Sequence, residues 1–196
     1  MRKGDPEKAE AVIQAALKQG VDEHRFLLKL GENYIEAKRY DEAEAALRKA
    51  LARKPKLATA WFNLGLVYEE KAQPEKAIAA YESELAQNDK AYRAAFNLAK
   101  ILQKAGRLPE AVARFRKAVE IQPDFGTGQL YLAKALLDTG DLPGAEEWAR
   151  KGLVNKPDAR MKPLGHFVLA DVYNRQGRPA EAEREAAAAR RLQGGG

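Results

Sequence analysis

A period of 34 residues runs along this chain and constrains its fold more than any other feature. The clearest copy carries Trp61, Leu64, Gly65 and Tyr68, and Ala77 follows after a polar interval. Copies before and after it place apolar or small residues at the same offsets. A unit of this length cannot bury its own apolar face, so neighbouring units must stack into a continuous core. The period therefore predicts a solenoid built of repeated units.

Each copy reads as two helices joined by a tight turn. Its apolar residues lie three and four positions apart, as on one face of a helix. That face is interrupted by a glycine suited to a left-handed helix end and then by a proline suited to a first helical turn. These residues are Gly4, Gly106, Gly140 and Gly177, and Pro6, Pro74, Pro109, Pro143 and Pro179. The predicted helices span residues 6–19, 24–37, 40–53, 58–71, 74–87, 92–105, 108–121, 126–139, 142–154, 162–176 and 179–192.

One slot of the second helix holds alanine in every copy. A side chain that ends at Cβ allows two helices to approach closely, and a larger one would overpack the contact by about 1–3 kcal/mol. We therefore expect this slot to be buried between helices. The residues are Ala9, Ala43, Ala77, Ala111, Ala145 and Ala182.

The whole pattern resembles the tetratricopeptide repeat, in which W-x2-L-G-x2-Y is followed by A-x3-F and then P. The resemblance implies an all-α fold, a right-handed α-solenoid superhelix of antiparallel helix pairs with about eleven helices. We expect a single domain over residues 1–196 that begins with a half repeat at 5–23. Full repeats then occupy residues 24–57, 58–91, 92–125, 126–159 and 163–196.

Composition removes several classes of function. There is no cysteine, so a disulfide framework and a thiolate metal site are both impossible. The 34 basic and 28 acidic residues are interspersed, whereas a nucleic-acid binder concentrates its positive charge. The sequence has no apolar run long enough to span a membrane and no signal peptide at its start. The cytoplasm is the default expectation, and the compartment stays open.

The sequence contains no recognisable catalytic or cofactor-binding pattern. Its two histidines, His24 and His166, lie far apart, and His166 occupies the slot of Trp61, which favours a packed residue. Phosphate-loop, zinc-protease, serine-hydrolase and calcium-loop patterns are not found. We therefore expect no enzymatic activity, no small-molecule substrate, no cofactor and no metal.

The family resemblance implies a concave surface lined by positions 2, 5, 6, 9, 12 and 13 of each repeat, all on first helices. Phe62, Phe96, Tyr131 and Phe167 would form an aromatic row there. Asn63 and Asn97 are equivalent residues whose amides could pair with the backbone of an extended peptide. An alternative is that asparagine is simply common at this position of the family. The expected peptide-binding residues are Phe62, Asn63, Leu66, Arg93, Phe96, Asn97, Lys100, Lys104, Tyr131, Lys134 and Phe167.

Charge is unevenly distributed along this predicted groove. Its N-terminal part carries Glu32, Glu36, Glu69 and Glu70, and its middle carries Arg93, Lys100, Lys104 and Lys134. The functional interpretation is a ligand with acidic residues opposite repeats three and four, and the alternative is an ordinary solvated face. A clamp for a C-terminal carboxylate is disfavoured. Asn63 and Arg93 fit such a clamp, but Leu28, Glu32 and Asn97 do not.

The sequence thus predicts a non-catalytic interaction scaffold that binds an extended peptide or protein segment in its concave groove. The first alternative is a self-assembly module that forms a homo-oligomer through its ends or convex face. RNA binding is a weaker alternative, because the related pentatricopeptide repeats have a 35-residue unit and the period here is 34.

Overall fold

A computed structural model describes residue 15, residues 22–57 and residues 59–194 of the chain. These residues form ten α-helices and one 3-10 helix, without a β-strand among them. Of the predicted helix 6–19, Ala15 alone is among the described residues, so that helix and the predictions for Gly4, Pro6 and Ala9 lie outside them.

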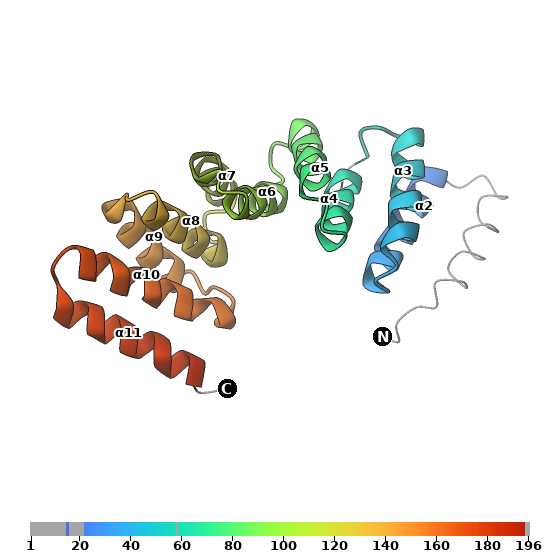
Figure 1. The fold of residues 1–196 in the computed structure, drawn as a ribbon. Coiled ribbons are helices and arrows are strands. Elements are labelled where there is room, and N and C mark those ends of the chain that lie inside the picture. The colour runs from blue at the N-terminus through green and yellow to red at the C-terminus, as the bar shows by residue number, and fades with distance from the viewer. Residues whose placement is uncertain (1–14, 16–21, 58, 195–196) are drawn as a thin grey trace. The chain divides into compact units, whose positions relative to one another are not determined.

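The structure consists of two compact units, residues 1–90 and 91–196, and each is described by itself. In both, the two helices of each repeat pack side by side (Figure 1). The first unit contains α2 (Glu23–Glu36), α3 (Tyr40–Arg53), α4 (Ala60–Glu70) and α5 (Pro74–Gln87). The second unit contains α6 (Tyr92–Lys104), α7 (Leu108–Ile121), α8 (Gly126–Asp138), α9 (Leu142–Val154), η1 (Ala159–Met161), α10 (Lys162–Arg175) and α11 (Pro179–Gly194).

These bounds lie within two residues of the predicted ones, and two local differences have physical causes. Helix α4 begins at Ala60 because Thr59 adopts a left-handed backbone, with φ at 68°. Residues 160–162, which lie between the fourth and fifth predicted repeats, overlap the 3-10 turn η1. The Asp158 carboxylate accepts a bond from the backbone N–H of Arg160 at 3.0 Å and so caps this turn.

The turn inside each pair has the same hydrogen bonds in all five described repeats. A residue with positive φ follows the first helix, and the next N–H bonds back across the helix end. In the third repeat, Arg107 N–H donates to Leu102 O at 2.9 Å and Gly106 N–H donates to Gln103 O at 3.1 Å. The positive-φ slot contains Lys38, Ala72, Gly106, Gly140 and Gly177. The predicted left-handed conformation of the three glycines is confirmed. Lys38 and Ala72 adopt the same conformation although they lack the backbone freedom of glycine.

The core lies between the helices of each pair and between stacked pairs. The alanine slot is buried as predicted, with zero exposure at Ala43, Ala77, Ala111 and Ala145 and 3% at Ala182. Leu64 is 2% exposed. At Gly65 a Cβ would lie 2.4 Å from Cε1 of Tyr81, so the glycine lets that ring approach α4 closely. The repeat pattern is therefore a packing pattern.

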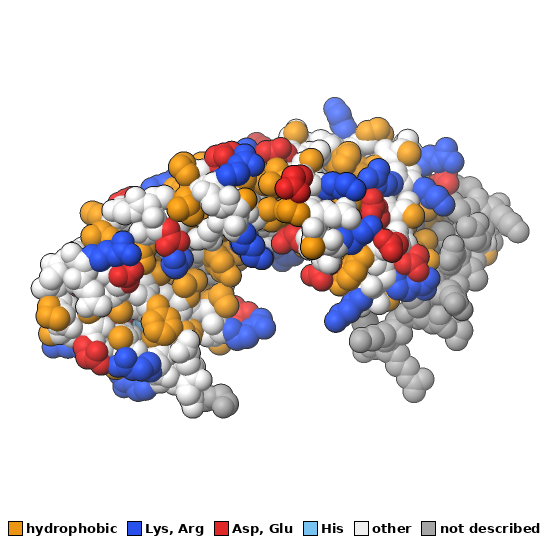
Figure 2. Space-filling model, in the orientation of Figure 1, with side chains coloured by type: hydrophobic (Ala, Val, Ile, Leu, Met, Phe, Trp, Pro, Cys, Tyr) orange, Lys and Arg blue, Asp and Glu red, His pale blue; other side chains and the backbone are white. Residues whose placement is uncertain are grey.

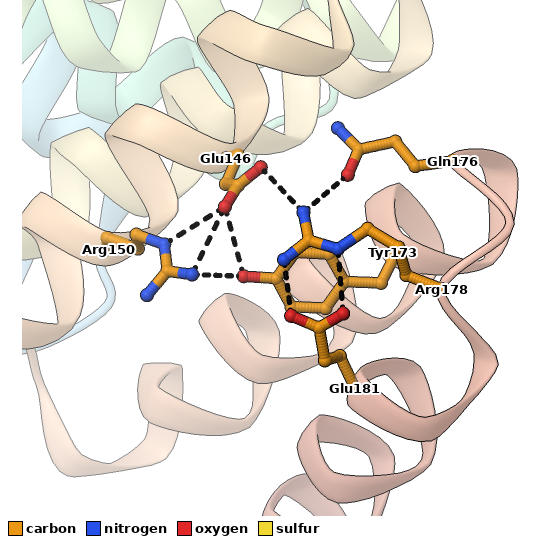
Figure 3. A network of polar contacts seen from close by, with 6 residues as sticks. All are labelled: Glu146, Arg150, Tyr173, Gln176, Arg178 and Glu181. Carbon is orange, nitrogen blue, oxygen red and sulfur yellow. Dashed lines mark hydrogen bonds and ion pairs between the residues drawn. The ribbon is translucent and has the colours of Figure 1, made fainter.

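A polar network joins α9, α10 and α11 in the second unit (Figure 3). The Tyr173 hydroxyl donates to Glu146 at 3.1 Å and accepts a bond from Arg150. Arg178 lies over the Tyr173 ring at 4.2 Å and pairs with Glu181. Burial alone raises the pKa of Glu146, but hydrogen bonds from Arg150 and Tyr173 outweigh it and hold that pKa below its usual value. The network thus ties one repeat to the next through a carboxylate that stays ionised.

The first unit repeats this arrangement at equivalent positions. Tyr68 donates to Glu44 at 3.1 Å and accepts from Arg48 at 2.9 Å, while Lys71 pairs with Glu44 at 2.6 Å. Burial tends to raise the pKa of Glu44, yet hydrogen bonds from Lys71 and Tyr68 lower it overall. Arg48 is consequently part of the packing between α3 and α4.

A second tie uses the fourth position of a repeat. Trp61 Nε1 donates to the Pro55 carbonyl at 3.1 Å, and Gln129 Nε2 donates to the Pro123 carbonyl at 2.7 Å. Asn155 adds a bond to Gln129 Oε1 at 2.9 Å. Within each unit, this donor fixes the loop that leads into the first helix of a repeat.

Candidate functional site

Helix α4 carries the predicted site residues of the first unit. Phe62 and Leu66 are half-buried, and the ring of Phe62 lies 5.8 Å from that of Tyr81. The backbone N–H of Phe62 also donates to the Glu84 carboxylate at 3.4 Å, and Glu84 is only 3% exposed. The aromatic side chain is thus fixed by α5 while part of it stays accessible.

The Asn63 side chain is buried, whereas an amide that contacts a ligand must be accessible. Its side chain is 8% exposed, and its Nδ2 atom is buried without a hydrogen-bond acceptor in the part of the chain that the structure describes. A buried donor left without a partner costs about 1–3 kcal/mol. The amide could donate to a ligand only after its side chain turned outward, and that turn would relieve this cost.

Five aromatic rings form a connected cluster in the second unit. Phe96 on α6 is central, with its ring centroid 5.1 Å from that of Tyr131 on α8 and 5.0 Å from that of Phe125. Tyr92 extends the cluster through Phe125 at 5.2 Å, and Phe115 on α7 lies beneath Phe96 at 5.7 Å. Phe96 and Tyr131 are half-buried, so the cluster joins the core to the surface.

The structure brings together two of the four residues predicted to form an aromatic row. Phe96 and Tyr131 are in direct contact, whereas Phe167 on α10 is 41% exposed and has no ring contact within the described residues. Phe62 belongs to the other unit. Sequence reasoning missed Tyr92 and Phe125, which lie at the two ends of the third repeat. The available signal was an aromatic residue at the start of each of two consecutive first helices, Tyr92 beginning α6 and Phe125 directly preceding α8.

One expectation about the predicted groove positions is wrong. Positions 5 and 6 were expected to line the concave surface in every repeat, but Leu130 at position 5 of the fourth repeat and Val168 at position 6 of the fifth repeat are only 0% and 1% exposed. Small neighbours admit Leu130 into the core, since a Cβ on Gly152 would lie 2.5 Å from its Cδ2 and one on Gly165 would lie 2.8 Å away. The accessible surface of α8 and α10 is therefore narrower than the repeat positions imply.

The predicted basic residues differ in their partners. Arg93 lies 5.7 Å from the centroid of the Tyr92 ring and donates to that hydroxyl at 3.2 Å. Lys100 lies over the Phe96 ring at 5.7 Å, and Lys104 is exposed. Within the described residues these three have no ion pair with a carboxylate. Lys134, in contrast, is paired with Asp138 on its own helix.

Net charge is concentrated in the second unit. Residues 1–90 contain 16 Lys and Arg and 16 Asp and Glu, whereas residues 91–196 contain 18 and 12. The whole excess of +6 therefore belongs to residues 91–196. On the face drawn in Figure 2, both signs are still interspersed with hydrophobic side chains. The unpaired cations of α6 are a local feature of this surface.

His166 has a partner within its own repeat. His166 is half-buried, and its Nδ1 lies 2.6 Å from the Glu185 carboxylate of the same repeat, which matches the predicted packing role. Among the described residues, no group of His, Cys, Asp and Glu could hold a metal, and no helix is long and apolar enough to cross a membrane. A hollow of about 410 Å³ is lined by Glu23, Lys49, Ala52 and Arg53 and contains none of the predicted site residues.

Comparison with known protein families identifies the repeat. A sequence model described as tetratricopeptide repeat matches residues 1–58, 28–92, 62–124 and 96–160, and a second with the same description matches residues 163–188. No curated protein matches the chain.

Solved structures match at low identity. YrrB, described as a TPR protein with an unusual peptide-binding site, has a TM-score of 0.80 at 17% identity over 92% of each chain. PilF of Pseudomonas aeruginosa has a TM-score of 0.69 at 23% identity, and the match covers 85% of this chain and 76% of the PilF chain. MamA of Desulfovibrio magneticus has a TM-score of 0.77 at 13% identity, and the match covers 88% of this chain and 96% of the MamA chain. These likenesses confirm the predicted all-α solenoid fold.

Proposed function

Because this chain belongs to the tetratricopeptide repeat family, we propose that it is a non-catalytic scaffold that binds an extended peptide or protein segment. Within each unit the segment lies along the first helices of the repeats. In the first unit Phe62 and Leu66 contribute from α4. In the second unit the α6 cations, Phe96 and Asn97 contribute from α6, and Tyr131, Lys134 and Phe167 contribute from α8 and α10. Asn63 donates to the backbone of the segment after its amide turns outward.

The exposure of aromatic side chains on first helices is the observation that carries this proposal. Phe167 is 41% exposed, and Phe96 and Tyr131 are half-buried members of a ring cluster. Large aromatic side chains that are already held in place bury much area on binding at little entropic cost. They suit apolar side chains of a peptide better than they suit a catalytic role.

The proposal can be tested by selecting an unbiased library of displayed peptides on the whole chain and measuring the affinity of a selected peptide by calorimetry. Phe167→Ala should weaken binding several-fold, because exposed aromatic anchors at interfaces cost about 1 kcal/mol or more when truncated. Trp148→Ala is the matched control, since Trp148 is a half-buried aromatic residue on the second helix α9 of the same unit.

Two results would count against a first-helix groove. A chain that selects no peptide at all does not act as a peptide scaffold. Equal loss of affinity in Phe167→Ala and Trp148→Ala would place the ligand elsewhere. A chain that binds no peptide but sediments as a dimer or larger species would instead favour the self-assembly alternative.

A further inference from the structure

We infer that the segment bound by this scaffold is acidic, and that Arg93, Lys100 and Lys104 of α6 select it. This inference rests on the proposed function and adds to it the chemistry of the partner. The ligand has Asp or Glu residues around an apolar residue, and the apolar residue packs beside Phe96 and Tyr131.

The three cations lie on one stripe of α6. Residues seven and eleven positions apart on a helix differ in direction by only about 20°. Arg93 and Lys100 are therefore about 10 Å apart along the helix axis, and Lys100 and Lys104 about 6 Å. An extended segment advances about 3.3 Å per residue, so carboxylates two or three residues apart would match these intervals. Helix α6 contains no acidic residue that could neutralise the stripe.

Aromatic rings hold two of these cations in place before any ligand arrives. The Arg93 guanidinium lies 5.7 Å from the Tyr92 ring centroid, and the Lys100 ammonium lies 5.7 Å from that of Phe96. Tyr92, Phe125, Phe96 and Tyr131 are themselves in contact, in that order. Side chains restrained in this way lose less freedom on binding, which favours a specific anionic partner over diffuse counterions.

Two cations on the other first helices of this unit differ from those of α6, because they are paired with acidic residues. Lys134 on α8 pairs with Asp138, and Arg175 on α10 pairs with Asp171, so both cations are already neutralised. Selection of acidic residues therefore belongs to α6. The contribution of Lys134, which the sequence grouped with the α6 cations, is correspondingly smaller.

A single-stranded RNA is the competing occupant, because basic and aromatic residues together also bind nucleic acid. Stacking of bases requires free ring faces. The central rings instead meet in edge-to-face contacts, at interplanar angles of 77° for Phe96 with Phe125 and 89° for Phe96 with Tyr131. These contacts occupy part of the surface that a base would need, so an acidic peptide is the better fit.

The experiment uses the same displayed peptide library on the whole chain, at low and at moderate salt. Peptides selected at low salt should be enriched in Asp and Glu around an apolar residue. A representative peptide is then titrated against Lys100→Glu/Lys104→Glu. Reversal turns two attractive charge pairs into repulsive ones, so we expect a loss of about tenfold in affinity, together with a weaker salt dependence.

The matched control is Lys117→Glu/Lys156→Glu, which changes the net charge equally at two exposed sites of the same unit outside the first helices. This control should bind the peptide with less than a twofold loss. Selected peptides without acidic enrichment, or equal losses in the two variants, would overturn the inference and leave the scaffold function standing. Absence of any selected peptide would overturn both. Competition by a uridine-rich single-stranded RNA at lower concentration than the peptide would overturn the acidic peptide in favour of nucleic acid.

Discussion

Tyr173 and Glu146 join two neighbouring repeats through a hydrogen bond of 3.1 Å, and Tyr68 and Glu44 form the same bond at 3.1 Å in the first unit. In both places the tyrosine belongs to a first helix and the glutamate to the second helix of the preceding repeat. An arginine one turn beyond the glutamate, Arg150 or Arg48, bonds the same hydroxyl. Polar chemistry thus contributes to stacking beside the apolar repeat positions.

Removal of the Tyr173 hydroxyl should destabilise the chain and uncouple this junction. Tyr173→Phe should lower the free energy of unfolding by about 1–3 kcal/mol, because the lost bonds involve charged groups. The check is a double-mutant cycle with Glu146→Gln, monitored by urea unfolding. A coupling energy of about 1 kcal/mol is expected for residues in contact. Strictly additive effects would mean that the hydroxyl and the carboxylate do not interact in solution.

Stability should fall in acid because Glu44 and Glu146 have lowered pKa values in the folded chain. A carboxyl with a lowered folded pKa stabilises fully above the unfolded value of about 4.3 and loses that contribution as pH falls through the folded pKa. Urea midpoints should therefore be nearly constant from pH 7 to 5 and decline below that range. Glu146→Gln should decline less steeply, whereas the exposed control Glu147→Gln should follow the wild type. Identical slopes in all three proteins would contradict the assignment.

The turn slots predict a stabilising substitution. Ala72 has φ at 53°, in the left-handed region that costs a residue with a Cβ about 1–2 kcal/mol. Ala72→Gly should raise the free energy of unfolding by up to about 1 kcal/mol, after the greater freedom of glycine in the unfolded chain is subtracted. Gly106→Ala, in the same slot with φ at 75°, should have the opposite effect. Thermal and urea midpoints measure both, and a change of the same sign in the two variants would refute this account.

Leu64 provides a test of the repeat register. It is 2% exposed in α4, and Leu64→Ala should cost about 2–5 kcal/mol through lost burial and the cavity left behind. Leu66→Ala, two residues away and half-buried, should cost clearly less. Urea unfolding of the two variants gives the comparison. Similar losses would show that the buried face of α4 has been misplaced.

The period predicted most of the fold because each repeated position has a physical role. The alanine slot, the turn glycines and core residues such as Leu64 all lie where the pattern placed them. The observed start of α4 differs from the predicted one because Thr59 has a left-handed backbone, and threonine is not a residue type that indicates this conformation. The 3-10 turn η1 depends on a hydrogen bond between Asp158 and Arg160, which periodicity cannot reveal.

The candidate site was less predictable, since exposure depends on neighbours that the period does not specify. Leu130 was expected at the surface, but Gly152 and Gly165 leave room for it in the core. Asn63 is buried although its position lies on a first helix. The pairing of Lys134 with Asp138 four residues later could have been read from helical spacing, whereas the contact of Lys100 with the Phe96 ring could not.

The ties also restrict which variants can serve as controls for binding. Charge reversal at Arg48 and Lys49 is an obvious control, because both residues lie on the second helix α3. Arg48, however, donates to Tyr68 at 2.9 Å and pairs with Glu44 at 3.0 Å. Its reversal would destabilise the junction between α3 and α4, so Lys117 and Lys156 are the better choice.

Trp61 and Gln129 have little in common as amino acids, yet each places one N–H on the carbonyl of a preceding proline. Tryptophan and glutamine are rarely exchanged in related proteins, yet each side chain donates the same kind of hydrogen bond to the loop that precedes its helix. Two of the five repeats thus use this position to donate to the loop, whereas Leu27 and Ala95 at the same position of two other repeats have no side-chain donor. A bond between a loop and the following helix can therefore be kept through a drastic change of residue type, which is in keeping with TM-scores of 0.69 to 0.80 between chains only 13–23% identical.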